Sequence, residues 1–595
     1  MVKKKRNRIL EGGLYNFLIL LLGIVAVNLL SEQFYDRIDL TKEGRFTLSN
    51  TSRELAKELD DAVYFHIFLE GDFPSEYRRL KKATKDMLNE FRRLSGNEVE
   101  YKFEDMLSGK DVQEKEDILR QLSSKGLLVT QPEMDVDEIA GEKYIIPGGL
   151  VFYKGKEYPI NLLKQEYGKS PEEIINGSIE LLEYEIANVL RKCISGKTAM
   201  IGFAEGHGEL GVMEIADVVR SLEEYYTVHR VNLNLLDTAT TRPFWDEIAR
   251  DTANSGAILF NGLLSGMLEY DAIVVAKPTI EFMEEELLLL DQYVMNGGKL
   301  VWLVDPMVAE MDSLDANSGT FVAFDRQINL DDMLFRYGVR LNPDLIEDLN
   351  CHGIPVINRR GGSRPGFQPW IFYPLAAMDS EHPIVRNLDN MWLRFASSID
   401  TLGRGNKKTV LLHTGENSRT MPNPVRVSLN LLAERPAPEL FRQKNIPMGV
   451  LLEGKFTSPF AKRRAVKRNA PVQLKDTIND NAMIVIADGD FVRNQVNPER
   501  GQIYPLGYDR YASQAFGQPI QFANKNFFIN CIDYLCDKSR LIDVRSKKVE
   551  LRLLDKVKVK KERLKWQLVN MVLPVVLILV FGIANGVYRR RKYVR

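Results

Sequence analysis

Cysteine and histidine are scarce in this chain, which limits the chemistry that it can carry. Only 4 Cys and 6 His occur among 595 residues. Cys193, Cys351, Cys531 and Cys536 are too few for a disulfide scaffold, and no Cys–His group has the spacing of a zinc site. We therefore expect no metal and no cofactor. Cys531 and Cys536 stand five residues apart in a predicted helix, so we expect buried thiols; a disulfide in an oxidising compartment is the alternative.

Several catalytic motifs are missing as well. The chain has no GxxxxGK[ST] phosphate loop, so nucleotide binding is not expected. A GxSxG nucleophile elbow and a CxxC redox motif are also lacking. We therefore predict no catalytic residues and a protein that is not an enzyme.

The charge balance argues against nucleic acid as a partner. The chain carries 80 basic and 81 acidic residues, a formal net charge of −1, and its two ends are strongly basic. The middle is therefore mildly acidic, the opposite of a nucleic-acid-binding surface. A hydrophobic content of 45% and a charged content of 27% are globular values, and the length predicts several domains.

Two long apolar segments lie at opposite ends of the chain, at Gly12–Ser31 and Trp566–Tyr588. Each is long enough to cross a hydrocarbon core of ~30 Å as a helix. The basic tails outside them, residues 1–11 and 589–595, are expected to stay in the cytoplasm. The sequence thus predicts a two-pass membrane protein with both ends in the cytoplasm and a large body on the far side of the membrane. The first segment is too long for a signal peptide and lacks its cleavage site.

The first exported region, residues 32–195, predicts a small α/β domain. Strand-like and helical segments alternate over 62–124, two strands with a Gly-rich bend follow at 143–160, and a long helix covers 170–191. The order is compatible with a thioredoxin-like architecture.

The second region, residues 196–545, predicts a larger doubly wound α/β domain. Apolar strands at 197–204, 270–278 and 299–306 are separated by helical segments, and a similar strand begins at 481. A mixed, partly β insertion is expected at about 310–480. Residues 546–565 are heavily charged and predict a partly helical stalk that leads to the second apolar segment, 566–588.

Polar side chains follow the predicted parallel strands, where open α/β sheets bind ligands. They are Glu205, His207, Glu209, Asp305, Asp488 and Asp490. A histidine among carboxylates suits acid–base chemistry or metal binding. The alternative is that these residues are only polar loop ends that cap or turn the chain. We treat them as candidate ligand-binding residues.

The whole pattern resembles the gliding-motility-associated auxiliary proteins of ABC transporters, the GldG family. The resemblance covers nearly the whole chain, including both apolar segments and their order. It rests on FTLSNTSRELAKEL, RRLKKATKDMLNEF, AEGHGEL, YDAIVVAKPTIEFMEEELLLLDQYVMNGGKLVWLVDP, LLEGKF, IADGDFVRN and NKNFFINCIDYL.

This resemblance implies a subunit of the bacterial inner membrane, with its large body in the periplasm, that works beside an ABC-2-type permease and a separate cytoplasmic ATPase. It also implies a central domain similar to class I glutamine amidotransferases and to a domain of intraflagellar-transport proteins. The amidotransferase cysteine has no counterpart here, because Lys277 and Pro278 follow the strand that would carry it.

Three functions remain open from the sequence. The first is a non-catalytic, substrate-binding-like transporter subunit that binds cargo or other cell-envelope proteins or polymers. The second is an anchored periplasmic hydrolase with a crevice around His207 and Asp305. The third is an envelope scaffold without a ligand.

Overall fold

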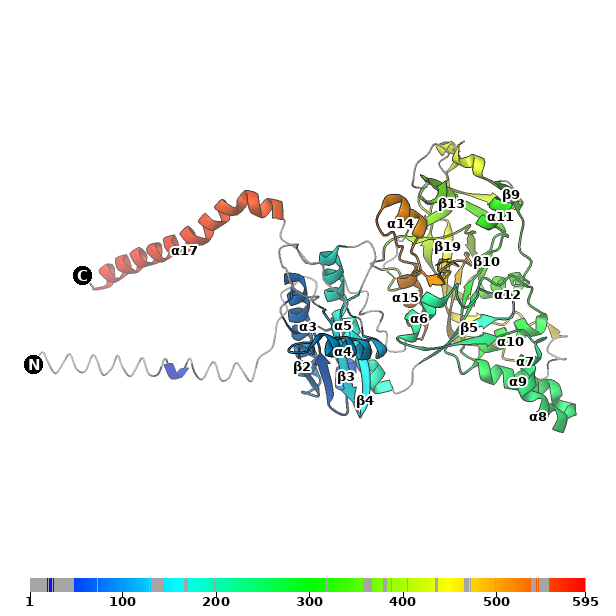
Figure 1. Cartoon of the computed structure of the whole chain (residues 1–595), viewed down its shortest axis with the longest axis horizontal. Helices are drawn as coiled ribbons and strands as arrows, with labels where there is room; N and C mark the ends of the chain where they lie inside the picture. The colour runs from blue at the N-terminus through cyan, green and yellow to red at the C-terminus, as the bar shows by residue number, and fades with distance from the viewer. Residues whose placement is uncertain are drawn as a thin grey trace, which may run out of the picture. The chain divides into compact units, whose positions relative to one another are not determined.

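The computed structural model describes residues 48–536 and 556–593 with internal gaps, plus a few isolated positions (Figure 1). The gaps are 72, 128, 130–143, 165–169, 196–198, 317–318, 357–365, 378–381, 387, 404, 434–436, 465–469, 471 and 498; the isolated positions are 19, 21–23, 25, 542 and 544. The chain divides into two compact units, Met1–Lys547 and Lys548–Arg595. Most of the predicted membrane segment Gly12–Ser31 therefore lies outside the described residues.

A four-stranded mixed sheet forms the centre of the N-terminal α/β region. Its order is β2-β1-β3-β4, with β1 parallel to β2 and antiparallel to β3, and β3 antiparallel to β4. The strands are β1 (Val63–Ile67), β2 (Val99–Phe103), β3 (Gly148–Tyr153) and β4 (Lys156–Asn161). The βαβ unit followed by a hairpin agrees with the alternation read from the sequence.

Four helices accompany this sheet: α2 (Asn50–Lys57), α3 (Ser75–Leu94), α4 (Val112–Ser124) and α5 (Pro171–Ser195). The side chain of Ser49 caps α2, and Asp111 with Glu114 forms a capping box on α4. Apolar residues of α2, α3 and α5 meet those of β1, β3 and β4 in one buried core. Helix α3 is amphipathic, with Leu80, Leu88 and Phe91 buried on one side.

A seven-stranded sheet organises the larger region, in the order β16-β19-β20-β8-β7-β5-β6. Five strands are mutually parallel, from β20 to β6, and β19 and β16 continue the sheet antiparallel. The parallel strands are β5 (Met200–Glu205), β6 (Thr227–Asn232), β7 (Ala272–Ala276), β8 (Lys299–Leu303) and β20 (Thr477–Ile486). The predicted doubly wound arrangement is therefore present.

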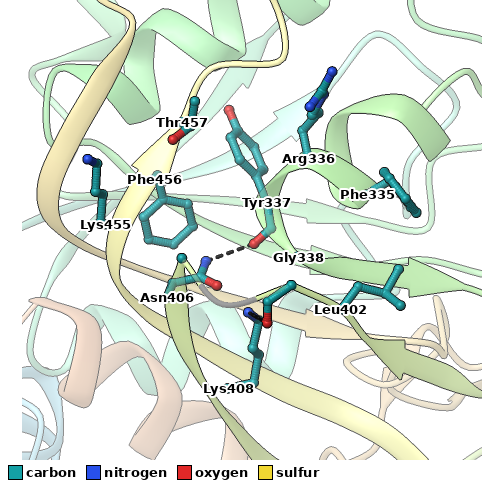
Figure 2. Close-up of a pocket in the computed structure, with 12 residues that line it drawn as sticks. Phe335, Arg336, Tyr337, Gly338, Leu402, Asn406, Lys408, Lys455, Phe456 and Thr457 are labelled. Carbon is teal, nitrogen blue, oxygen red and sulfur yellow. Dashed lines mark hydrogen bonds between the residues drawn. The ribbon is translucent and has the colours of Figure 1, made fainter.

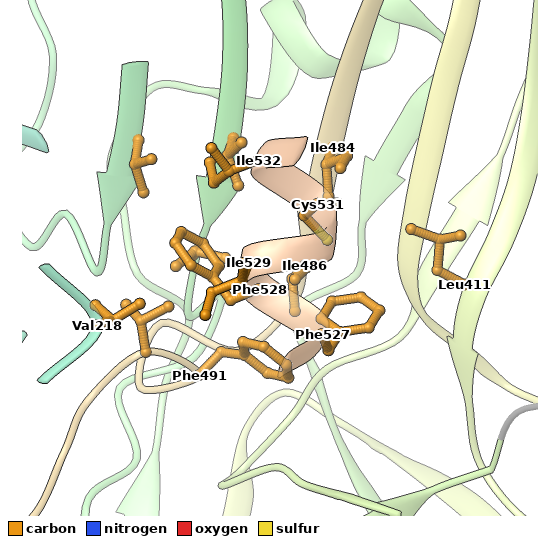
Figure 3. Close-up of a cluster of buried hydrophobic side chains, with 14 of the residues drawn as sticks. Val218, Leu411, Ile484, Ile486, Phe491, Phe527, Phe528, Ile529, Cys531 and Ile532 are labelled. Atoms are coloured by element: carbon orange, nitrogen blue, oxygen red, sulfur yellow. The ribbon is translucent and has the colours of Figure 1, made fainter. Parts of the chain in front are cut away.

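Both faces of this sheet are buried, as the continuous apolar strands require. In β7, Val274 joins the core on one face, whereas Ile273 and Val275 join the core on the other. The first face packs against α6 (Ala216–Glu223) and α15 (Asn524–Cys536); the second packs against α10 (Glu284–Met295) and α12 (Asp331–Tyr337). Figure 3 shows side chains of α15 packed beside those of β20 on the first face.

The segment between 310 and 480 does more than form an insertion. Its strands β16 (Asn406–His413) and β19 (Pro447–Thr457) extend the main sheet. The other strands pair in small sheets. They are β9 (Thr320–Ala323), β10 (Val339–Leu341), β11 (Asp344–Asp348), β12 (Cys351–Val356), β13 (Gly366–Ala376), β14 (Met391–Trp392), β15 (Ile399–Thr401), β17 (Ser418–Pro422) and β18 (Val425–Ser428). Most of them surround a separate apolar core that contains Trp370 and Phe372, whereas β10 and β15 join the core on the second face of the main sheet.

Shorter elements complete this region: α7 (Thr238–Thr241), α8 (Trp245–Arg250), α9 (Ser255–Met267), α11 (Met311–Ala316) and α14 (Arg510–Phe516), and the hairpin strands β21 (Val496–Asn497) and β22 (Gln502–Ile503).

Cys531 and Cys536 both lie on α15, and all four cysteines are thiols. The disulfide considered from the sequence is therefore not formed in this structure.

The described residues of the C-terminal unit form one long helix, α17 (Lys556–Tyr593). Its stretch Lys561–Tyr588 is long and apolar enough to cross a membrane, and none of its most apolar window is buried. The predicted second membrane segment is thus helical throughout, and the described part of the charged stalk forms the first turns of the same helix.

Candidate functional site at the carboxyl ends of the parallel strands

The strand order places the ligand-binding position of this fold between β5 and β7. From β5 the chain moves to β6 on one side and then returns to β7 on the other, so the direction of winding reverses there. In doubly wound sheets, ligands bind outside the carboxyl ends of the strands at such a reversal. His207 follows β5 and Lys277 follows β7, so both belong to this edge.

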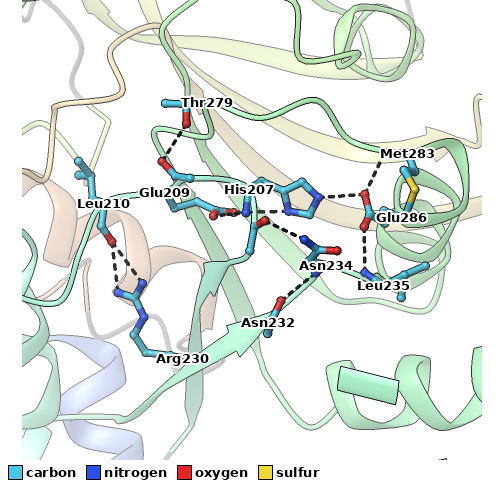
Figure 4. A network of polar contacts seen from close by, with 12 residues as sticks. His207, Glu209, Leu210, Arg230, Asn232, Asn234, Leu235, Thr279, Met283 and Glu286 are labelled. Atoms are coloured by element: carbon cyan, nitrogen blue, oxygen red, sulfur yellow. Dashed lines mark hydrogen bonds and ion pairs between the residues drawn. The ribbon is translucent and has the colours of Figure 1, made fainter. Parts of the chain in front are cut away.

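The loop after β5 fills this position by packing on the loop after β7. The carbonyl oxygen of His207 accepts hydrogen bonds from the backbone amides of Thr279 and Ile280, at 2.8 and 2.9 Å. The Thr279 hydroxyl donates to the Gly208 carbonyl at 3.2 Å, as Figure 4 shows. A Cβ on Gly208 would lie 2.1 Å from Thr279 Oγ1, and its φ of +73° is left-handed, so glycine is required for this closure. The chain itself therefore occupies the crevice.

His207 is the centre of the first polar cluster, and only 2% of it is exposed. Its Nε2 lies 2.9 Å from a carboxylate oxygen of Glu286, on the first turn of α10. Its ring stacks on Phe282, with centroids 4.0 Å apart. Glu286 also accepts hydrogen bonds from the amides of Met283 and Leu235. One carboxylate thus ties together the loops after β5 and β6 and the start of α10.

Glu209 completes this cluster from the same loop as His207. Its carboxylate accepts the His207 backbone amide at 2.7 Å, and its other oxygen lies 3.9 Å from His207 Nδ1. The side chain is 1% exposed, and burial raises the pKa of Glu209. With His207 so enclosed, acid–base chemistry on an outside molecule would require this loop to open.

The same loop carries a spacing that the sequence reading overlooked. Residues 206–211 read GHGELG, which matches the G-x-G-x-x-G of dinucleotide-binding loops. In such loops the backbone amides face a pyrophosphate at the start of a helix. Here the amides of His207 and Gly211 are bonded to the carboxylates of Glu209 and Glu214, and α6 begins only at Ala216. The motif therefore lacks the geometry of a phosphate cradle.

Lys277 is the centre of the second cluster, with 4% of it exposed. Its ammonium lies 2.8 Å from Asp490, 3.4 Å from Asp305 and 3.2 Å from Glu310. Asp488 is turned differently: its carboxylate accepts the backbone amides of Asp490 and Arg394, each at 2.8 Å. The ends of β7, β8 and β20 are thus joined by one lysine and its carboxylates.

Within the second cluster, the pKa values of Asp305 and Asp488 are raised, whereas that of Asp490 is lowered. Burial and the nearby Asp490 raise the pKa of Asp305 to about 6, and burial with the charge of Asp305 raises that of Asp488. Burial also opposes ionisation of Asp490, but Lys277 and Arg394 outweigh it and hold the pKa of Asp490 below its ordinary value. For Lys277, burial lowers the pKa, but Asp305 and Asp490 more than compensate and raise it. A lysine held in its charged form is a poor nucleophile.

Two backbone features show how tightly the second cluster is packed. Lys277 has a φ of +57°, a left-handed conformation that a non-glycine residue rarely adopts. A Cβ on Gly489 would lie 2.8 Å from Lys277 Cγ and 3.0 Å from Asp305 Cγ. Surrounding contacts therefore hold the lysine in a strained turn, as residues in such conformations require.

The six predicted residues lie at one edge of the sheet but do not form one site. His207 and Glu209 share the first cluster, and Asp305, Asp488 and Asp490 share the second. Glu205 belongs to neither: its carboxylate accepts a hydrogen bond from Arg230 of the neighbouring strand β6 at 2.8 Å. No group of three metal-ligating side chains suited to an ion is found among the residues that the structure describes.

Sequence reasoning missed the partners that complete both clusters. Lys277 could have been found by the rule that selected Asp305, because both lie in loops that follow parallel strands. Glu286 carries a weaker signal, the third helical position of a capping box. Glu310 and Arg394 carry none, since they come from irregular segments that only the folded chain brings near.

Two family models match parts of this chain. The model of the family described as "ABC-type uncharacterized transport system" (ABC_transp_aux) matches residues 199–531, more than half of the chain. The chain belongs to this family of ABC transport-system auxiliary proteins. A second model, a domain of unknown function (DUF7088), matches residues 42–151. A Borreliella burgdorferi protein named "Uncharacterized protein" is 21% identical over 605 residues, which cover 99% of this chain and 100% of that protein.

Solved structures give only distant likenesses. The "mmIFT52 N-terminal domain" is 11% identical with a TM-score of 0.27, over 57% of this chain and 98% of that one. The exo-beta-1,4-mannosidase Op5Man5 from Opitutaceae bacterium strain TAV5 is 9% identical with a TM-score of 0.17, over 53% of this chain and 35% of that one. Neither likeness supports an argument about fold or function.

Proposed function

We propose that this chain is a non-catalytic auxiliary subunit of an ABC-2-type transporter of the GldG kind, serving gliding motility or cell-envelope transport. Its partners are an ABC-2-type permease, a cytoplasmic ATPase and the lipid bilayer. The observation that carries the proposal is the family match over residues 199–531 in a chain that also has an apolar helix of membrane-spanning length. Because the chain has no phosphate loop, the ATPase must be a separate protein.

The proposal includes a two-pass topology with both tails in the cytoplasm and the large body in the periplasm. It is supported by the exposed, apolar helix at Lys561–Tyr588 and by the basic residues that follow it. The first membrane-spanning segment would be Gly12–Ser31, which is supported by the sequence alone. A cytosol-specific reporter fused to either end should be active, and inactivity at both ends would overturn this topology.

Burial of the strand-end clusters supports a role without catalysis. His207 and the three aspartates are each at most 9% exposed, and the switch-point crevice is filled by the chain's own loop. We propose that both clusters clamp strand ends together rather than bind a ligand. A thioredoxin-like first region, supported by the order β2-β1-β3-β4, and an amidotransferase-like second region with Lys277 in place of the nucleophile belong to the same proposal.

Helix α17 offers a specific surface for contact with a permease. Gly582 and Gly586 form a GxxxG motif, and a Cβ at either position would meet no heavy atom within 4 Å. Such small-residue stripes allow membrane helices to approach closely. We propose that this stripe faces the permease.

Co-purification tests the partnership directly. A tagged full-length chain, expressed with its native operon and solubilised in mild detergent, should retain an ABC permease and an ATPase. Gly582→Leu with Gly586→Leu should reduce their recovery. Ala584→Leu, a change of similar size on the opposite side of the helix, is the matched control. Isolation of the wild-type chain without either partner would contradict the proposal, whatever the variants do.

A further inference from the structure

A pocket lies away from the strand-end clusters, near the antiparallel edge of the main sheet (Figure 2). Its lining comes from the end of α12, the loop before β16, the start of β16 and the end of β19. The cavity volume is about 190 Å³. At ~30 Å³ per water molecule, this is room for about six waters or for a group with a similar number of heavy atoms.

The lining is cationic and contains no carboxylate. Arg336, Lys408 and Lys455 contribute to it, and none of the twelve lining residues is Asp or Glu. Tyr337 and Phe456, each 1% exposed, supply an apolar base. A positive pocket beside buried aromatic rings strengthens electrostatic attraction, because water screens it less there than on an open surface.

Lys408 is the cation that enters the pocket. In Figure 2 its ammonium is turned toward the middle of the lining residues, whereas Arg336 and Lys455 extend outward. The ammonium donates to the Gly403 carbonyl at 3.0 Å, which uses one of its three N–H groups. Beside it, the Asn406 amide donates to the Tyr337 carbonyl at 2.7 Å. Burial lowers the pKa of Lys408, so an arriving negative charge would restore favourable surroundings for its charged form.

The neighbouring lysine shows what an ordinary surface cation looks like on the same strand. Lys407 is 69% exposed along its side chain and lies 3.2 Å from Glu453 of β19. Successive side chains of a strand point to opposite faces, so Lys407 lies away from the pocket. Lys408 therefore differs from Lys407 in placement and in having no ion pair with a described carboxylate.

We propose that this pocket binds a small anionic group, a phosphate or a carboxylate, with the Lys408 ammonium as its main contact and Arg336 and Lys455 at the rim. This inference is independent of the transporter partnership, because it concerns the isolated chain. The group would be a free anion or the charged part of a larger envelope molecule that reaches the pocket from solvent.

Calorimetric titration of the purified full-length chain in detergent tests the proposal. Inorganic phosphate, acetate and glucose 1-phosphate are the probes, and glucose is the neutral control. We expect saturable binding of at least one anionic probe and none of glucose, with affinity falling as salt rises. Lys408→Gln should weaken binding about tenfold or more, the loss expected for a hydrogen bond to a charged group. Lys407→Gln removes a positive charge from the adjacent residue and should leave the affinity for the anionic probes unchanged.

The outcomes separate clearly. Phosphate alone, acetate alone or glucose 1-phosphate alone would each support the site and identify its chemistry. No saturable anion binding, or equal weakening by Lys407→Gln and Lys408→Gln, would overturn it.

Two further variants test the site if Lys408→Gln fails to fold. Lys408→Arg keeps the positive charge and should retain anion binding, whereas Arg336→Gln, a substitution of an exposed residue, should weaken it. Because no permease or ATPase is present, failure here leaves the transporter proposal intact.

Discussion

The ammonium of Lys277 lies 2.8 Å from a carboxylate oxygen of Asp490, although 213 residues separate the two along the chain. The first residue follows the central strand β7, and the second follows β20, two positions away in the same sheet. Between them, Asp305 comes from the loop that follows the intervening strand β8. This lysine is therefore the countercharge that allows several carboxylates to be buried at one edge of the sheet.

Replacing Lys277 should strongly destabilise the larger region. Lys277→Met leaves Asp305 and Asp490 buried without their main cation, and breaking a buried pair from one side costs about 3–5 kcal/mol. Chemical denaturation of the full chain in detergent, followed by tryptophan fluorescence, measures this change, since Trp302 is fully buried in β8. Lys407→Met, which removes an exposed ion pair, should cost less than about 1 kcal/mol. Equal losses for the two variants would contradict the assigned role.

Asp305 should make stability fall as pH rises from about 4 to about 6. Its pKa is raised from 3.8 to about 6 by burial and by Asp490, so the folded state holds a proton that the unfolded state releases. The resulting stabilisation is complete below the unfolded pKa and is lost as pH rises through the folded pKa.

Asp305→Asn removes this titration while keeping an acceptor for the Gly489 amide, which donates to Asp305 at 2.5 Å. The stability of the wild type relative to this variant should therefore decrease by roughly 1–3 kcal/mol between about pH 4 and pH 7. Parallel unfolding curves at several pH values measure the difference. A constant difference across that range would show that Asp305 titrates normally.

Gly489 should not tolerate a side chain. The Cβ of Gly489→Ala would press on Lys277 and Asp305, and overpacking of this kind costs about 1–3 kcal/mol. Gly177→Ala, inside helix α5, meets no heavy atom within 4 Å and should stabilise the chain by up to about 1 kcal/mol. Thermal unfolding of both variants measures the two changes in stability. A loss in Gly489→Ala but not in Gly177→Ala would show that the close contact with Lys277 and Asp305, rather than the replacement of a glycine as such, causes the destabilisation.

His207 should matter for stability and not for transport. His207→Ala removes the stack on Phe282 and leaves Glu286 without its imidazole partner, a loss of about 2–4 kcal/mol. His207→Gln retains a donor toward Glu286 and should be less destabilised. A folded His207→Gln protein should support transport and recover its partners as the wild type does. Complete loss of function in that folded variant would favour the anchored-hydrolase alternative.

Much of the secondary structure could be predicted because its causes are local. The apolar run that contains Ala272–Ala276 is a buried strand, the Glu-rich start and apolar body of Glu284–Met295 form a helix, and Trp566–Tyr588 is helical. The rule that the carboxyl ends of parallel strands meet at one edge also placed His207 and Asp305 together at that edge of the sheet. It could not assign their partners, since Glu286 and Glu310 come from other segments whose approach depends on loop paths.

By itself, the sequence determined the α/β alternation and the apolar C-terminal helix, because periodicity and hydrophobicity are properties of neighbouring residues. Only the tertiary structure decided that Glu205 pairs with Arg230, that the β5 loop fills its own crevice, and that β16 and β19 widen the main sheet. These features depend on which strands become neighbours and how closely their loops pack, and contacts between distant residues settle both.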